Sequence, residues 1–295
     1  MWGWLGRRAK MRAARAHLAG VTSAEAAVAD AEKPPVPTPD PTAAAFFDVD
    51  NTMLRGASIY WLARGMAARD YFTTTDLLRF GYKQLKFRLF HEDAQDISST
   101  RQAALAFIAG RRADEMERLS EAVYDELMEP RIWEGTRALA LQHLQSGQRV
   151  WLVTAAPVEL ARLIARRLGL TGALGTVAET VDGVYTGRLI GDLLHGEAKA
   201  EAVKALAARE GLDLSRCSAY SDSYNDMPML TTVGHAVAVN PDAELRREAR
   251  RRGWEIRDFR TGRKAARVAL PTMAGAGAVM GAVYGAMALR RRRQR

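Results

Sequence analysis

Two aspartates, Asp48 and Asp50, follow a short apolar run and could form the reactive centre of an enzyme that transfers phosphate. A phosphate monoester is anionic, so a protein that attacks it must neutralise charge and supply a nucleophile. A carboxylate can be that nucleophile and form an aspartyl-phosphate, which water then hydrolyses. Asp48 could take this part, and Asp50 could protonate the leaving group as a general acid.

Three further stretches carry groups that bind phosphate or a metal ion. Thr154 follows the apolar run 149–153 and offers a hydroxyl. Lys199 precedes the helical pattern 200–209 and offers a cation near a helix N-terminus, where anions bind. Asp222 and Asp226 follow the run 217–221. Carboxylate oxygens beside a phosphate site indicate Mg²⁺, held partly by the protein and partly by substrate and water.

Each of these stretches alone has an ordinary structural explanation. An Asp-x-Asp pair is usually a turn or a helix cap, a single lysine on a helix is usually solvated, and a threonine at a strand end usually satisfies the backbone. The four stretches together, in this order, favour an enzyme. The alternative is a catalytically inactive binding or scaffold protein, tethered to a membrane, that keeps a relict site.

The surrounding pattern predicts an α/β fold with a parallel sheet and helices on both faces. Strands are expected over 43–47, 149–153, 217–221, 236–239 and 254–256, and helices over 134–146, with Gly147 as its C-cap, and 158–168, ended by Gly169. Asp182-Gly183 predicts the turn of a β-hairpin. Because open α/β sheets bind ligands at the carboxyl ends of their strands, the candidate residues are expected to meet at one edge.

With these motifs in place, the chain resembles the haloacid dehalogenase-like superfamily, and within it the IB-type hydrolases related to phosphoserine phosphatase. The resemblance covers roughly residues 43–259. It implies a Rossmann-like core with an inserted helical cap, and a phosphatase because Asp50 is present. It also implies a role for each candidate residue: Asp48 as nucleophile, Asp50 as general acid/base, Thr154, Lys199 and Asn225 as phosphate or substrate contacts, Asp48, Asp222 and the Asp50 carbonyl as Mg²⁺ ligands, and Asp226 as a second carboxylate near the metal.

The substrate is less well specified. Phosphoserine phosphatases carry a glutamate shortly after the first motif, where it recognises the amino group of serine. The corresponding stretch here, 53–61, has no acidic residue and one basic residue, Arg55. A buried site without an anionic partner binds an ammonium group poorly. The expected substrate is therefore a phosphomonoester that is either phosphoserine-like or linked to a lipid.

The chain divides into four regions. Residues 1–42 are expected to be a disordered basic and proline-rich tail, since five of the ten prolines fall within 34–41. Residues 43–56 and 131–262 should form the catalytic core. Residues 57–130 should form the cap, with helices near 57–69, 74–90, 97–110 and 114–129, which would close over the site and select substrates. Residues 263–295 form a basic, apolar C-terminal tail.

Charge and hydropathy bear on partners and location. The net charge is +9, and residues 245–295 carry fifteen Lys or Arg against three acidic residues, whereas 43–244 carry 22 against 27. No nucleic-acid motif accompanies the basic tail, so no nucleic-acid partner is expected. Residues 268–289 contain no charged residue and are long enough to cross a bilayer, with Arg290 to Arg293 after them. Their Ala and Gly content equally fits a peripheral tail.

A single cysteine, Cys217, excludes an internal disulfide and fits a reducing compartment. We therefore expect a cytoplasmic catalytic domain, with attachment to the inner face of the membrane through 268–289 as one of two alternatives. The sequence does not specify an oligomeric state.

Overall fold

The computed structural model describes residues 2–29, 40–69, 71, 105 and 108–260. Of the four cap helices expected from the sequence, those near 74–90 and 97–110 lie wholly or mostly outside the described residues. The C-terminal segment 268–289 also lies outside them.

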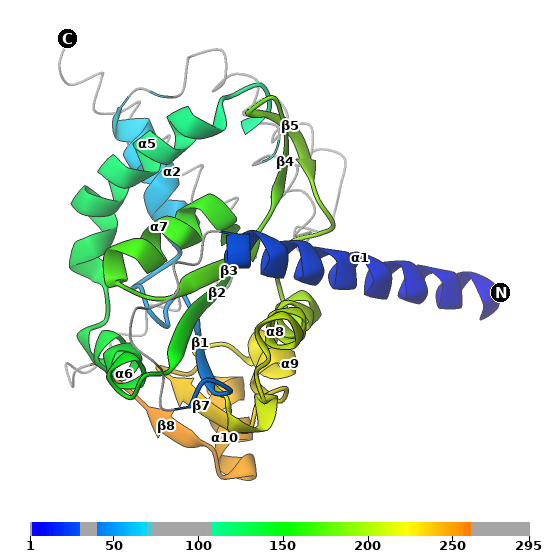
Figure 1. Cartoon of the computed structure of the whole chain (residues 1–295), viewed down its shortest axis with the longest axis vertical. Coiled ribbons are helices and arrows are strands. Elements are labelled where there is room, and N and C mark those ends of the chain that lie inside the picture. The colour runs from blue at the N-terminus through cyan, green and yellow to red at the C-terminus, as the bar shows by residue number, and fades with distance from the viewer. Residues whose placement is uncertain (1, 30–39, 70, 72–104, 106–107, 261–295) are drawn as a thin grey trace.

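A six-stranded parallel sheet forms the centre of the molecule (Figure 1). Its order is β3-β2-β1-β6-β7-β8, so β1 lies in the middle between β2 and β6. The strands are β1 (Ala44–Asp48), β2 (Arg149–Pro157), β3 (Gly172–Thr176), β6 (Ser218–Ser221), β7 (His235–Val239) and β8 (Glu255–Arg257). All five neighbouring pairs are parallel. This confirms the expected α/β class.

Helices cover both faces of the sheet. Successive residues of β1 point to opposite faces, so each face contributes to its own apolar cluster. Phe47 packs into the apolar cluster on the face covered by α6 (Glu134–Gln145) and α7 (Val158–Leu168). Phe46 packs into the cluster on the other face, under α8 (Glu197–Glu210), α9 (Met227–Leu230) and α10 (Ala243–Arg252). Both phenylalanines are fully buried, which makes β1 the most protected strand and a rigid support for the loop after it.

Helices α2 (Ser58–Ala68) and α5 (Ala113–Val123) lie at the carboxyl edge of the sheet, between β1 and β2 in the chain. They pack closely, since a Cβ on Gly65 would lie 2.3 Å from the Val123 side chain. A π-helical turn, η1 (Tyr124–Met128), and a 3₁₀ turn, η2 (Glu129–Arg131), lead back to the sheet. We propose that residues 57–130 form a cap over the core.

The expected hairpin is present as β4 (Ala178–Val181) and β5 (Val184–Leu189), which pair antiparallel. Asp182 and Gly183 both have positive φ, at 51° and 75°. This is the combination that a two-residue type I′ turn needs, and it explains why Asp-Gly marks the turn. A bridge from Arg112 to Val184 joins the hairpin to the start of α5.

The N-terminal region differs from the expected disordered tail. Residues 2–29 form one long helix, α1 (Trp2–Ala29), whose second half packs across α8 and β3. Gly20 allows the close approach: a Cβ there would lie 2.7 Å from the backbone nitrogen of Ala202. Ala19, Ser23 and Ala24 are buried in the same contact. Small residues of both helices make this contact, so the sequence of α1 lacks the stripe of large apolar residues that usually indicates a packed helix.

No helix among the described residues has the length and hydropathy of a membrane span.

Candidate active site

The strand register brings three of the four motifs to one edge of the sheet. Asp48 is the last residue of β1 and pairs with Val153 of β2, so Thr154 follows immediately beside it. On the other side, Phe47 pairs with Tyr220 of β6, which places Ser221 level with Asp48 and Asp222 just beyond. Adjacent parallel strands therefore end at the same level, so the polar residues that follow them lie side by side at this edge of the sheet.

Lys199 from α8 completes the cluster. Its Nζ donates to Asp48 Oδ1 at 2.6 Å and to Asp226 Oδ2 at 2.8 Å. All three side chains are almost fully buried, with Lys199 4%, Asp48 4% and Asp226 2% exposed. Ser221 Oγ donates to the same oxygen of Asp226 at 2.7 Å, which fixes that carboxylate on the lysine. One cation therefore joins the ends of β1 and the loop after β6.

Asp50 lies in the loop after β1 and is held by the first helix of the cap region. The backbone N–H of Ser58, the first residue of α2, donates to Asp50 Oδ1 at 2.8 Å. Ala57, the N-cap residue of α2, makes no side-chain cap hydrogen bond. Asp50 therefore satisfies one of the free N–H groups that begin every helix, and its carboxylate is placed by that bond.

Thr154 is buried, and its Oγ1 accepts the N–H of Ala156 at 3.1 Å. Because the acceptor side of the hydroxyl is used in this way, its own proton is available to an anion at the sheet edge. Thr52 Oγ1 donates to Asp222 Oδ1 at 3.3 Å, and the carbonyl of Thr52 accepts from the buried Thr136 hydroxyl at 2.8 Å. These bonds fix the loop that joins the first motif to the last.

Asn225 is the expected site residue that does not join the cluster through its side chain. It lies in the 3₁₀ turn η4 (Tyr224–Asp226) and is exposed, and its backbone N–H donates to Ser223 Oγ at 3.2 Å. Its backbone carbonyl approaches Gly196 at the start of α8. Asp48, Asp50, Thr154, Lys199, Asp222 and Asp226 occupy the sheet edge, whereas Asn225 lies at its rim.

Excess negative charge is the main electrostatic feature of the site. Burial raises the pKa of Asp48 to about 7, although the nearby Lys199 opposes the shift. Burial, and then the charges of Asp48 and Asp226, raise the pKa of Asp222 well above its usual value. Burial also raises the pKa of Asp50, against the Ser58 N–H. For Lys199 burial lowers the pKa, but Asp226 and Asp48 more than compensate and raise it.

This donor set fits a hard divalent cation. Four aspartate carboxylates lie near a single lysine, Lys199. A divalent cation would therefore reduce the repulsion between them, which adds to burial in raising the pKa of Asp222. No group of three or more acidic, histidine or cysteine side chains in the described residues is arranged to hold an ion by itself. Two carboxylates and a backbone carbonyl suffice for Mg²⁺, which takes its remaining ligands from water and phosphate oxygens.

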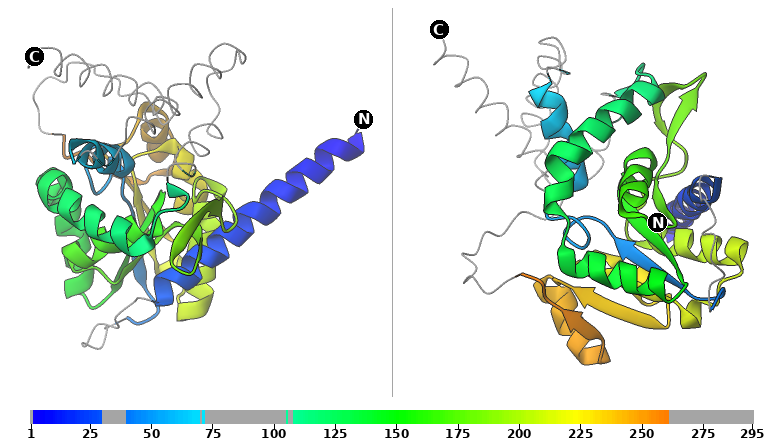
Figure 2. Two further views of the ribbon diagram at one scale, coloured as in Figure 1. Left: turned by 90° about the horizontal axis from the view of Figure 1, so that it is seen from above. Right: turned by 60° about the vertical axis from the view of Figure 1, so that its left-hand side comes forward.

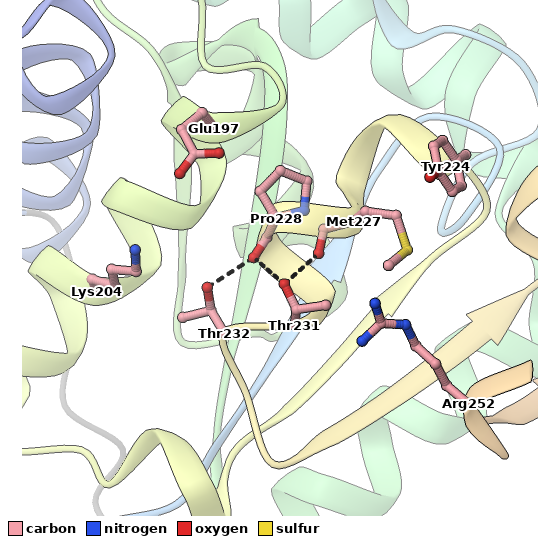
Figure 3. Close-up of a pocket in the computed structure, with 8 residues that line it drawn as sticks. All are labelled: Glu197, Lys204, Tyr224, Met227, Pro228, Thr231, Thr232 and Arg252. Carbon is pink, nitrogen blue, oxygen red and sulfur yellow. Dashed lines mark hydrogen bonds between the residues drawn. The ribbon is translucent and has the colours of Figure 1, made fainter. Parts of the chain in front are cut away.

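A surface hollow lies close to this edge but outside the cluster (Figure 3). Glu197 and Lys204 line it from α8, and at 3.6 residues per turn they lie on the side of the helix away from Lys199. Thr231 and Thr232 donate to the Pro228 carbonyl at 3.2 and 2.8 Å. These bonds secure the end of α9, the short helix that directly follows Asp226.

Three contributors were not expected from the sequence: the Ser221 hydroxyl, the Ser58 N–H and the Thr136 hydroxyl. Ser221 directly precedes Asp222 at a strand end, and that position was its only signal. The Ser58 contact is made by the backbone and has no side-chain signature.

Known proteins resemble this chain in sequence and structure. The profile of the haloacid dehalogenase-like hydrolases matches residues 45–231. The phosphoserine phosphatase SerB1 of Mycobacterium tuberculosis (strain ATCC 25618 / H37Rv) is 58% identical over 267 residues, which cover 90% of this chain and 85% of SerB1. A histidinol-phosphatase of Neisseria meningitidis serogroup C (strain 8013) is 30% identical over 224 residues, covering 73% and 98%.

Among solved structures, a protein of unknown function from Bordetella pertussis Tohama I superposes with a TM-score of 0.64 and 28% identity. The match covers 74% of this chain and 98% of that one.

Proposed function

Because the chain belongs to the haloacid dehalogenase-like hydrolase family, and is a phosphoric monoester hydrolase similar to phosphoserine phosphatase, we propose that it hydrolyses its substrate through an aspartyl-phosphate on Asp48 with the help of Mg²⁺. The observation that carries the proposal is the buried Lys199, bonded at 2.6 Å to Asp48 and at 2.8 Å to Asp226 at the carboxyl end of the central strands.

The proposed reaction has two displacements at phosphorus. In the first, a carboxylate oxygen of Asp48 attacks and the bond from phosphorus to the ester oxygen breaks, while Asp50 gives its proton to the departing oxygen. In the second, water attacks the phosphorus of the aspartyl-phosphate, Asp50 takes a proton from that water, and Asp48 leaves as a carboxylate. Phosphate and an alcohol are the products, and both aspartates return to their starting states.

The raised pKa of Asp50 suits its two proposed roles as general acid and general base, because its carboxyl must hold a proton at the start of the first displacement and accept one in the second. Lys199 and the Thr154 hydroxyl are positioned to hold phosphoryl oxygens at the sheet edge. Mg²⁺, when bound by the side chains of Asp48 and Asp222 and the carbonyl of Asp50, would neutralise charge on the transferred group. Asp226 keeps Lys199 in place, and Asn225 at the rim would contact the substrate.

The names of the relatives and the loop 53–61 support two candidate substrate classes. SerB1 is named for phosphoserine and the meningococcal relative for histidinol phosphate; both compounds are phosphate monoesters of an alcohol that also carries an amino group. We propose a small phosphomonoester of this kind, phosphoserine-like, as the substrate. The absence of an acidic residue from 53–61 favours a second candidate, a lipid-linked phosphomonoester that carries no amino group to be recognised there.

A phosphate-release panel tests the proposal. Purified full-length protein is assayed with and without Mg²⁺ on phosphoserine, histidinol phosphate, glycerol phosphate, lysophosphatidic acid and an aryl phosphate. We expect Mg²⁺-dependent release, abolished in Asp48→Asn and unchanged in Asp182→Asn, which alters an exposed hairpin turn. Preference for the lipid phosphate would select the second candidate. Release by Asp48→Asn at the wild-type rate would refute the nucleophile.

A further inference from the structure

Helix α1 has two halves with different surroundings. The second half is docked: Ala19, Ser23 and Ala24 are buried, and His17 contacts Glu201 of α8 at 3.2 Å. Before His17 the helix leaves the body of the protein, and Lys10 to Arg15 are all exposed. Both views in which α1 is seen from the side show its first half extending away from the sheet and its helices (Figures 1 and 2). At about 1.5 Å per residue, the part of this helix before the docked half, residues 2–15, is about 21 Å long.

The charge of this extension has one sign. Residues 2–24 contain five Lys or Arg, at positions 7, 8, 10, 12 and 15, and no acidic residue; the first is Glu25. The part of the chain that forms the core and cap, 43–244, has 22 basic against 27 acidic residues. A cationic helix therefore stands out from a slightly anionic body, and its own protein offers it no neutralising surface in the described residues beyond the Glu201 contact.

Two large apolar side chains are also exposed on this extension. Met11 is 62% and Leu18 49% exposed. They are seven residues apart and so lie on one side of the helix, roughly opposite Ser23 and the docked face. Lys10 and Arg12 flank Met11, and Arg15 lies on the same side of the helix between Met11 and Leu18.

We propose that the free half of α1 attaches the protein to the surface of an anionic lipid bilayer. Basic residues on such a helix are drawn to anionic headgroups, and the exposed apolar side chains beside them enter the boundary with the acyl chains, while the long basic side chains reach up to the headgroups. Charge disfavours pairing with the α1 helix of a second copy, because two helices with five positive charges each repel one another. A nucleic acid would use the charges but not the exposed Met11 and Leu18, so these two side chains favour the bilayer.

Flotation of the full-length chain with vesicles tests this attachment. The vesicles are phosphatidylglycerol with phosphatidylcholine, or phosphatidylcholine alone, at low and at high salt. We expect binding to the anionic vesicles that weakens with salt. The triple variant Lys10→Gln, Arg12→Gln, Arg15→Gln should bind anionic vesicles on the order of a hundredfold more weakly, since each basic residue near the surface strengthens binding roughly fivefold. Met11→Ser with Leu18→Ser should also weaken binding.

The C-terminal sequence provides the matched control, because it too is basic. Arg290→Gln, Arg291→Gln and Arg292→Gln remove the same charge there and should leave flotation at least tenfold stronger than that of the α1 triple variant. Turnover of an aryl phosphate should equal wild type in every variant, which shows that the core is folded. The proposal is overturned if the α1 triple variant floats like wild type, if wild type binds neutral vesicles equally well, or if it binds duplex DNA and no vesicles.

Discussion

Replacing Lys199 by methionine would remove the one cation that joins Asp48 and Asp226. Both ion pairs are short, at 2.6 and 2.8 Å, and the lysine is 4% exposed. Removing one partner of a buried pair strands an uncompensated charge, at a cost of about 3–5 kcal/mol in the free energy of unfolding. Methionine fills a similar volume, so little of the loss would come from a cavity. We expect a loss in that range for metal-free Lys199→Met at pH 8.

The matched control is Lys204→Met on the same helix. Lys204 pairs with Glu201 at 2.9 Å, but its side chain is 48% exposed, and an exposed pair contributes little. Its free energy of unfolding should stay within about 0.5 kcal/mol of wild type. Urea unfolding of both variants measures the difference. Phosphate release should fall roughly 10²–10³-fold in Lys199→Met, as expected for loss of a group that stabilises the transition state, and stay unchanged in Lys204→Met.

The pH dependence separates charge from packing. Asp48 already has a pKa of about 7 with Lys199 beside it, and without the lysine that pKa would rise further. At pH 5.5 the stranded carboxylate would bind a proton, so the loss of stability should be smaller than at pH 8. An equal loss at both pH values, or a loss no greater than that of Lys204→Met, would refute the account of Lys199 as a buried double ion pair.

Three other predictions address the acid, the nucleophile and the N-terminal helix. Ser58→Pro should remove the N–H that holds Asp50 while leaving α2 intact, because proline suits the first helical position. The rate of hydrolysis of alkyl phosphates should then fall at least about tenfold more than the rate for an aryl phosphate with a good leaving group. Ser58→Ala keeps the N–H and should change neither rate. In metal-free protein the folded pKa of Asp48, about 7, exceeds its usual value near 4, so the native state binds the extra proton and stability should fall as pH rises between these values. In thermal melts Asp48→Asn should reduce this slope, and the raised pKa values of Asp50 and Asp222 should account for what remains; a slope of the opposite sign in wild type would contradict the burial. Gly20→Val should push α1 off α8 and cost about 1–3 kcal/mol, seen as faster cleavage after Glu25, in the docked half of α1, by a glutamate-specific protease, whereas Ala13→Val on the exposed part should be cleaved there like wild type.

The central sheet was predictable from the sequence because its strands are apolar runs that end in polar residues. The 43–47 and 217–221 runs became β1 and β6 with shifts of one residue, and 149–153 became the longer β2. Strand β3 was not predicted. Its sequence contains Gly172 and Gly175, which weaken any strand signal, yet a Cβ on either would lie 2.6 Å from Trp151 or Val158. The close packing of β3 requires these glycines, and the glycines weaken the pattern by which the strand could be predicted from the sequence.

Helix α1 was mispredicted for a related reason. Its contact with α8 is made by Ala19, Gly20 and Ala24, which have too little side chain to produce an apolar period in the sequence. A smaller error concerns the end of α6, where Ser146 is the C-cap and Gly147 follows it with a φ of 75°. Glycine is favoured there because that backbone conformation is strained for other residues.

The candidate site was predictable to the extent that it consists of side chains at strand ends. Asp48, Thr154 and Asp222 follow strands that the register aligns, and Lys199 begins a helix that points at the same edge. The choice of partners could not be predicted, because the carboxylates that Lys199 joins depend on the packing of α8 against the sheet. The cap region likewise carries no short-range pattern that specifies a pocket.

The bond from the Ser58 N–H to Asp50 has a consequence for how such enzymes can diversify. Every amino acid except proline presents this N–H, so the contact itself excludes only proline, whereas the burial of Ser58, which is 0% exposed, requires a small side chain at residue 58. A lineage can rewrite its cap for a new substrate, or a protein engineer can graft a foreign one, and Asp50, the proposed proton donor, keeps this hydrogen bond provided that a helix with a small first residue starts at the same point. Selection would then act on where α2 begins, in backbone geometry, and comparison of residue types at this position would overlook it.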